Sequence, residues 1–149
     1  MQPSLAAVAA RHMMATTRIN PRDKEAMDMN EAATLDLEQA IRDNYRLWNE
    51  GKREELDRLF AAMGPDGFTI EYVGAPAIDG PTAMADMWTK YGGQCITEPA
   101  EVIVNGSEGA AYVANRLQTP DGVVTLPSLE TYKVEDGRLT IRYFHRAAD

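Results

Sequence analysis

Apolar positions recur every three or four residues in three stretches of the chain, and this spacing predicts three short helices. The first begins after Thr34, which suits an N-cap, and ends at Gly51. The second covers residues 53–62 and is followed by glycine and proline. The third begins at Pro81, since proline suits the first turn of a helix, and carries methionine and aromatic residues on one side.

The other patterned segments are typical of strands, because they are rich in β-branched and aromatic residues. One strand, residues 68–73, lies between the second and third helices. From Cys95 onward the pattern predicts only strands, over residues 95–104, 110–119, 123–134 and 138–146. Asn-Gly or Asp-Gly pairs separate these segments, and such pairs are strong signals for β-hairpins. We therefore expect an antiparallel meander of four strands.

The beginning of the chain has a different character from the rest. Residues 1–33 show no apolar periodicity, so we interpret them as a flexible N-terminal arm before one domain over residues 34–149. The segment 5–10 lacks the charged start of a signal peptide, and its apolar run is barely long enough for one. No apolar run approaches the ~20 residues that span a bilayer. We expect a cytoplasmic protein.

Composition and charge exclude several classes of partner. The chain has 149 residues and a net charge of −8, and its basic residues are scattered among acids. Phosphate binding needs clustered Lys and Arg, so nucleic acid and anionic membranes are poor partners. The single cysteine, Cys95, and the distant His12 and His145 form no metal-binding motif. No glycine-rich phosphate loop follows a strand, so we expect neither a metal nor a cofactor.

Three segments resemble parts of the nuclear transport factor 2-like superfamily. Residues 45–51 (YRLWNEG) are similar to the end of its first helix, residues 71–80 (EYVGAPAIDG) to its first strand and following loop, and residues 129–139 (LETYKVEDGRL) to its penultimate hairpin. The superfamily includes ketosteroid isomerases, SnoaL-like polyketide cyclases, scytalone dehydratase and limonene epoxide hydrolase. The resemblance covers about residues 35–146. It implies an α+β fold, a cone-shaped curved antiparallel sheet packed with three N-terminal helices (a cystatin-like α+β barrel) around a small-molecule pocket.

The resemblance to ketosteroid isomerases implies three catalytic residues. Glu71, nine residues before Gly80, falls where those enzymes keep the Asp that moves a proton. Glu130 falls where they keep a protonated Asp that donates to the oxyanion, and Tyr45 lies one position from their oxyanion-binding Tyr. Both acids are Glu rather than Asp here, so the likeness does not imply a steroid isomerase.

Glu71 and Glu130 suit proton transfer in an apolar pocket, and each also has a structural alternative. An acid in an apolar pocket loses hydration, which raises its pKa toward neutrality and makes it an efficient general base. Two such acids repel each other, so one stays protonated and can donate a hydrogen bond. However, Glu71 would face solvent if Tyr72 faced the core, because strand residues alternate. The alternative for Glu130 is a buried ion pair.

Two arginines on the predicted meander are further candidates. Arg142 would stabilise an enolate or clamp a substrate carboxylate if it shared a face with Glu130, and otherwise it forms a salt bridge at the rim or a dimer face. Arg116 is a candidate substrate-binding residue. An epoxide hydrolase of this superfamily needs an Asp–Arg–Asp set that holds water, but Gln118 stands two residues after Arg116.

The remaining substrate-binding candidates are the aromatic residues and the histidine of the predicted domain. They are Trp88, Tyr112, Tyr132, Phe144 and His145. Aromatic side chains form flat apolar walls with polar tips, although core packing is the alternative. Histidine is the side chain whose unperturbed pKa lies closest to neutrality, so His145 is a second candidate base, with a surface or interface role as its alternative.

These observations favour a cofactor-free lyase or isomerase. It would act on a small, mostly apolar oxygenated compound, with aromatic and polycyclic compounds among the candidates, by proton abstraction and oxyanion stabilisation. Dehydration, cyclisation and retro-aldol C–C cleavage use the same groups. The alternatives are a non-catalytic ligand-binding or dimeric assembly module and an epoxide hydrolase-like enzyme. The outer sheet face carries apolar residues that a single layer cannot cover, so we expect a homodimer through that face.

Overall fold

The computed structural model describes residue 22 and residues 35–147 of the chain. The helices are α3 (Leu37–Asn49), α4 (Arg53–Met63) and α5 (Gly80–Tyr91). The strands are β1 (Phe68–Tyr72), β2 (Ile78–Asp79), β3 (Cys95–Asn105), β4 (Glu108–Thr119), β5 (Gly122–Glu135) and β6 (Arg138–His145). The predicted N-terminal arm lies outside the described residues, except for Arg22.

The three predicted helices are confirmed, with one change at an end. Asp36 caps α3 by accepting a hydrogen bond from the Gln39 amide at 3.1 Å, whereas the predicted cap Thr34 lies outside the described residues. Asp79 caps α5 in the same way, by accepting from the Thr82 amide at 3.3 Å. Each carboxylate satisfies an amide that the first turn leaves without a partner.

The strands form one six-stranded sheet in the order β2-β1-β6-β5-β4-β3. The meander from β3 to β6 is antiparallel, as the turn residues predict. The expected curved sheet is confirmed, but it is mixed and not purely antiparallel, because β1 pairs with β6 in parallel. The short strand β2, which the sequence analysis placed in a loop, pairs with β1. A register shift between Pro99 and Glu101 interrupts the β3–β4 ladder, and such bulges bend a sheet.

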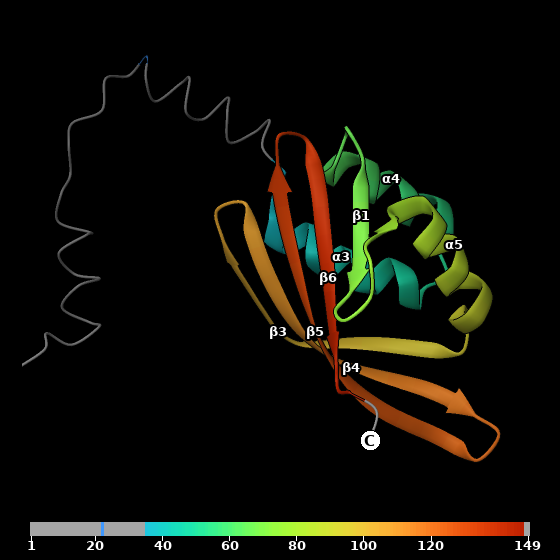
Figure 1. Ribbon diagram of the computed structural model, residues 1–149. Helices are drawn as coiled ribbons and strands as arrows, with labels where there is room; N and C mark the ends of the chain where they lie inside the picture. Colours follow the sequence, from blue (N-terminus) through green and yellow to red (C-terminus); the bar gives the residue numbers. More distant parts are fainter. Residues whose placement is uncertain (1–21, 23–34, 148–149) are drawn as a thin grey trace, which may run out of the picture. The chain divides into compact units, whose positions relative to one another are not determined.

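All three helices lie on one face of this curved sheet (Figure 1). The core between helices and sheet holds fully buried side chains from every layer, among them Ile41, Leu56, Phe60, Ile70 and Ile141. Burying a side chain of this size stabilises a fold by roughly 1.5–3 kcal/mol. We call the helix-covered face of the sheet the inner face and the opposite one the outer face.

The end of α3 is tied to the edge strand β3. The indole Nε1 of Trp48 donates to the carbonyl of Cys95 at 2.9 Å. The Asn49 amide nitrogen donates to the Thr97 carbonyl at 2.7 Å, and its oxygen accepts from the Thr97 amide at 2.8 Å. Asn49 thus pairs with the edge strand as another strand would, which fixes the distance between the end of α3 and the sheet.

Candidate functional site

A cavity of about 410 Å³ lies between the inner face of the sheet and the helices α3 and α5. Its walls are mostly apolar and aromatic. They are formed by Asn44, Tyr45, Trp48, Tyr72, Met84, Met87, Tyr91, Cys95, Thr97, Asn115, Leu117, Leu126, Glu130, Tyr143 and His145. Mostly apolar walls with a few converging polar groups are typical of a binding site for a small organic molecule.

Glu130 on β5 is the one acid in this lining. It is buried, with 6% of its surface exposed. Its Oε1 accepts from the hydroxyl of Tyr45 on α3 at 3.0 Å, and its Oε2 accepts from the hydroxyl of Ser128 at 2.7 Å. Burial raises the pKa of Glu130 to about 7, although hydrogen bonding by Ser128, Tyr45 and Tyr132 acts in the opposite direction. A carboxyl with this pKa can both accept and donate a proton near neutral pH.

The hydrogen bonds of Glu130 belong to a larger buried cluster. The hydroxyls of Tyr45 and Tyr132 lie 2.7 Å apart, and the Asn44 amide donates to Tyr132 at 2.8 Å. On the other side, the Asn115 amide donates to the Ser128 hydroxyl at 2.9 Å. Burial raises the pKa of Tyr45 and of Tyr132 well above the ordinary value of 10.0, so both hydroxyls keep their protons.

No arginine or lysine of the described residues lines the cavity, and none forms an ion pair with Glu130. The alternative of a buried ion pair is therefore not realised in the described part of the chain. Without a cation to lower it, the pKa of Glu130 follows from burial. A cavity without arginine or lysine is better suited to an uncharged ligand than to an anion.

The expectation that Glu71 faces this cavity is wrong. Glu71 lies on the outer face, where its Oε2 accepts from Arg142 Nε at 2.7 Å. The two residues are paired in register between β1 and β6, whereas their neighbours Tyr72 and Tyr143 point inward and line the cavity. Arg142 therefore does not share a face with Glu130, and its structural alternative, a salt bridge on the outer face, is the arrangement observed.

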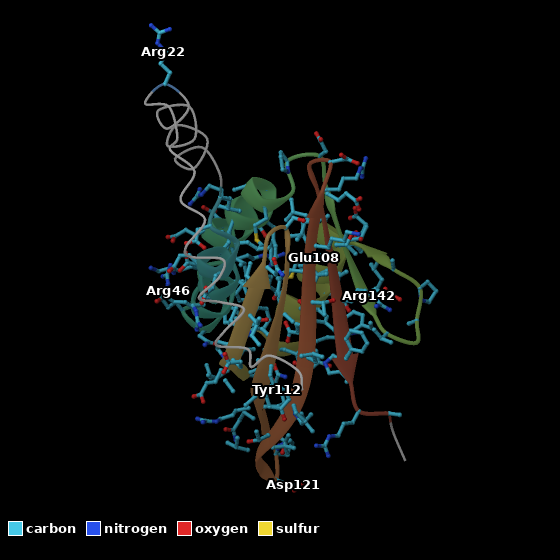
Figure 2. The ribbon with its side chains drawn as sticks, turned by 90° about the vertical axis from the view of Figure 1, so that its left-hand side faces the viewer. Arg22, Arg46, Glu108, Tyr112, Asp121 and Arg142 are labelled. Carbon is cyan, nitrogen blue, oxygen red and sulfur yellow. The ribbon has the colours of Figure 1, made fainter. Side chains whose placement is uncertain are left out.

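Three predicted substrate-binding residues also lie on the outer face. Tyr112 is half exposed, and Figure 2 shows it with Arg142 on the sheet, in front of the helices. Arg116 is exposed and donates to Glu98 at 2.7 Å, so it does not bind a ligand in the cavity. Phe144 lies beneath the guanidinium of Arg142, whose Cζ is 5.1 Å from the ring centre. Strand alternation places all three away from the cavity.

The other candidates lie at or near the cavity. His145 lines it and stacks on Tyr72, with ring centres 6.2 Å apart. Tyr132 does not line it but belongs to the buried cluster around Glu130. Trp88 packs against Trp48, at 4.2 Å between ring centres, and so supports the wall from behind.

Several residues of the cavity wall and of the cluster around Glu130 were not predicted as site residues from the sequence. The polar ones are Asn44, Tyr72, Tyr91, Thr97, Asn115, Ser128 and Tyr143. For two of them the signal was alternation relative to Glu130: Ser128 stands two residues before it, and Tyr143 is opposite it in the β5–β6 register. Asn44 precedes Tyr45 and gave no separate signal in the sequence.

The described part of the chain offers neither a metal site nor a membrane-spanning helix. There, no three His, Cys, Asp or Glu side chains gather closely enough to hold a metal ion. No helix among the described residues has the length and apolar character needed to cross a membrane.

Comparison with solved structures identifies the fold. No family model and no curated protein matches the chain. An NTF2-like protein of unknown function from Cytophaga hutchinsonii matches with a TM-score of 0.52 and 15% identity, over 72% of this chain and 96% of that one. The chain has the nuclear transport factor 2-like fold.

Two enzymes also match with this nuclear transport factor 2-like fold. SalBIII, described as an epoxide hydrolase/cyclase-like enzyme in pyran ring formation in the polyether salinomycin, matches with a TM-score of 0.59 and 19% identity, over 72% of this chain and 88% of that one. An LEH-like epoxide hydrolase from M. tuberculosis matches with a TM-score of 0.54 and 19% identity, over 73% and 81%. At these identities the likeness shows the fold and carries no reaction.

Proposed function

We propose that the protein is a cofactor-free acid–base enzyme of the lyase or isomerase type, which moves a proton on a small, uncharged, mostly apolar oxygenated molecule. The observation that carries this proposal is Glu130, a buried carboxyl in the wall of a cavity of about 410 Å³ with a pKa of about 7. Glu130 replaces Glu71 as the proton-transferring group. Dehydration, cyclisation and retro-aldol cleavage remain reactions that such a group can serve.

Tyr143 is suited to bind the substrate oxygen in this scheme. It lines the cavity and stands opposite Glu130 in register. Its hydroxyl has no hydrogen-bond partner among the described residues, while burial raises its pKa well above 10.0, so it remains a neutral donor. A preorganised donor beside the base stabilises the negative charge that develops on a carbonyl oxygen when the neighbouring carbon loses its proton.

The alternatives receive less support. A non-catalytic module would leave both Glu71 and Glu130 exposed or ion-paired. Glu71 is indeed paired with Arg142, but Glu130 is buried in the cavity wall without an ion pair among the described residues. An epoxide hydrolase-like reaction through Arg116 lacks its arginine, because Arg116 is paired with Glu98 on the outer face. The enzyme names of SalBIII and of the M. tuberculosis protein support an enzymatic role, although the sequence identity of 19% does not favour one reaction.

Proton transfer can be tested without knowledge of the natural substrate. Trp48 lines the cavity, so tryptophan fluorescence reports the entry of a ligand. We would add a panel of cyclic and aryl ketones in D2O and follow the loss of the α-hydrogen signal by proton NMR. We expect a ketone that binds to exchange its α-hydrogens for deuterium faster in the presence of the protein than in buffer alone. Binding across the panel with no faster exchange would contradict the proposal.

We also propose that the protein forms a homodimer through the outer face. Tyr112, Leu129 and Ile103 on neighbouring strands expose 51%, 41% and 66% of their surfaces there. Monomeric proteins rarely expose a continuous apolar patch of this kind. Sedimentation velocity should show a dimer of the wild-type protein and a monomer of Leu129→Asp. Ala61→Asp, at an exposed position of α4, is the matched control and should remain dimeric. A wild-type monomer would refute this arrangement.

A further inference from the structure

Each carboxylate oxygen of Glu130 ends a separate series of hydrogen bonds. We call Asn115 and Ser128, which lead to Oε2, the first arm, and Asn44, Tyr132 and Tyr45, which lead to Oε1, the second arm. In the first arm, the Asn115 amide nitrogen donates both to the Leu126 carbonyl at 3.0 Å and to the Ser128 hydroxyl at 2.9 Å. A backbone carbonyl can only accept, so the orientation of this amide is fixed. Ser128 must then use its own proton toward Glu130 Oε2, at 2.7 Å. Oε2 is an acceptor whether or not the carboxyl is ionised.

The second arm has no such fixed end. The Asn44 amide contacts the Tyr132 hydroxyl at 2.8 Å and has no other side-chain hydrogen bond among the described residues. From there the arm continues to Tyr45 at 2.7 Å and to Glu130 Oε1 at 3.0 Å. When Glu130 is ionised, every proton points toward it: Asn44 donates to Tyr132, Tyr132 to Tyr45, and Tyr45 to Oε1.

The same arm accommodates the protonated carboxyl in the opposite direction. If the Asn44 amide turns over, it presents its oxygen to Tyr132 instead of its nitrogen. Tyr132 then donates to Asn44, Tyr45 donates to Tyr132, and the protonated Oε1 donates to Tyr45. Each hydroxyl keeps one donated and one accepted bond in both states, so neither buried hydroxyl is left unsatisfied.

We infer that Asn44, Tyr132 and Tyr45 form a hydrogen-bond chain that reverses its direction when Glu130 gains a proton at Oε1, while Ser128 and Asn115 hold Oε2 as a permanent acceptor. Asn44 and Tyr132 are thus positioning residues that act on Glu130 through Tyr45. The inference deepens the proposed function, because it concerns the same carboxyl. It explains how a carboxyl in an enclosed cluster can take up and release a proton without breaking the cluster.

Other groups that titrate or carry charge around Glu130 must be considered in a test. They are Tyr45 of α3, Tyr72 of β1, Asp86, Lys90 and Tyr91 of α5, Cys95 of β3, Tyr132 of β5, and Tyr143 and His145 of β6. The inner face of β4 contributes Asn115 and Leu117 to the cavity and no titratable side chain. Asp86 forms a salt bridge with Lys90 at 2.9 Å and does not line the cavity. Tyr72 is a suitable control, because it lines the cavity but lies outside the chain.

The test is a titration of the Glu130 carboxyl carbon by ¹³C NMR in Tyr132→Phe, with the signal assigned by its absence in Glu130→Gln. In this variant the ionised carboxyl still accepts from Tyr45, but the protonated one leaves the Tyr45 proton without an acceptor. The hydrogen bonding of Tyr132 also lowers the pKa of Glu130, so its loss acts in the opposite direction. An unsatisfied buried hydroxyl in the protonated state outweighs both this loss and the lost cooperativity along the chain. We therefore expect the Glu130 pKa to fall by about one unit. Tyr72→Phe removes a hydroxyl from the same cavity and should leave the Glu130 pKa within about 0.3 unit of its wild-type value.

A one-way chain that serves only the carboxylate predicts the opposite sign, a higher pKa in Tyr132→Phe. Either a rise or an unchanged pKa would overturn the inference. Asn44→Leu removes the other end of the chain and should also lower the pKa, so it serves where Tyr132→Phe does not fold. The titration needs no substrate. A lowered pKa in a protein that binds ketones of the panel without exchanging their α-hydrogens would keep the inference and refute the proposed function. Exchange with a raised or unchanged pKa would keep the proposed function and refute the inference.

Discussion

Glu130→Gln should slow ketone exchange by about 10²- to 10⁴-fold, which is the contribution that a positioned acid or base makes to catalysis. Glutamine keeps the shape of the glutamate side chain and can still form hydrogen bonds with Tyr45 and Ser128, but it cannot take up a proton near neutral pH. The remaining rate reflects positioning and the donors around the substrate oxygen. The measurement is the loss of the α-hydrogen NMR signal in D2O under equal ligand saturation, read by tryptophan fluorescence.

Glu71→Gln is the matched control for that experiment, because it makes the same chemical change on the outer face. Glu71 is paired with Arg142 at 2.7 Å and does not line the cavity, so its exchange rate should stay within about twofold of wild type. If Glu71→Gln lost exchange and Glu130→Gln retained it, the assignment of the base would be wrong and the original expectation from the resemblance would stand.

The second large effect concerns stability. Burial raises the pKa of Glu130 from 4.5 to about 7, so the folded protein holds a proton that the unfolded chain releases between these values. The unfolded state binds fewer protons in this window, and the contribution of Glu130 to stability therefore falls as the pH rises. Over about 2.5 pH units the loss is on the order of 3 kcal/mol, and it is complete above about pH 7.

Glu130→Gln remains uncharged throughout and should not show this loss. Relative to wild type, its free energy of unfolding should increase by on the order of 3 kcal/mol between pH 4.5 and a pH above 7. Urea unfolding at a series of pH values measures the difference, and comparison of the two proteins removes the contributions of other titrating groups. Parallel curves for both proteins over this window would contradict the burial of an ionisable carboxyl in the core.

Apolar periodicity and turn residues predicted the helices and the hairpins. They did not predict which strands pair when the strands are far apart in the sequence. Hairpins at Asn105-Gly106 and Asp136-Gly137 are encoded by adjacent residues, and both turns occur where expected. The parallel pairing of β1 with β6 joins segments that are about seventy residues apart, such as Ile70 and Ile141. Nothing in either segment specifies its partner, so an antiparallel sheet was the simpler expectation.

Glu71 was expected to face the cavity because that prediction followed the family resemblance and not the alternation of side chains along β1. Phe68, Ile70 and Tyr72 form the apolar side of β1, and Thr69 and Glu71 the polar side. Apolar side chains turn to the core, which places Glu71 outside. The same alternation on β6 separates Ile141 and Tyr143 from Arg142.

Glu130 could be located by resemblance, but its surroundings could not. Its neighbours in register are Ala111 on β4 and Tyr143 on β6. Its hydrogen-bond partner Tyr45 comes from α3, eighty-five residues away. Contacts across this separation arise from the packing of α3 on the sheet, which apolar periodicity predicts only as a face and not as an atom-to-atom pairing.

The proposed function requires that one carboxyl in the cavity wall titrates near neutrality. A ¹³C NMR titration of the Glu130 side chain in the wild-type protein tests it directly. The structure predicts a midpoint of about 7, because burial without a neighbouring cation disfavours the ionised form. A midpoint near the ordinary value of 4.5 would contradict the account, since such a carboxyl would be fully ionised at neutral pH and a poor base.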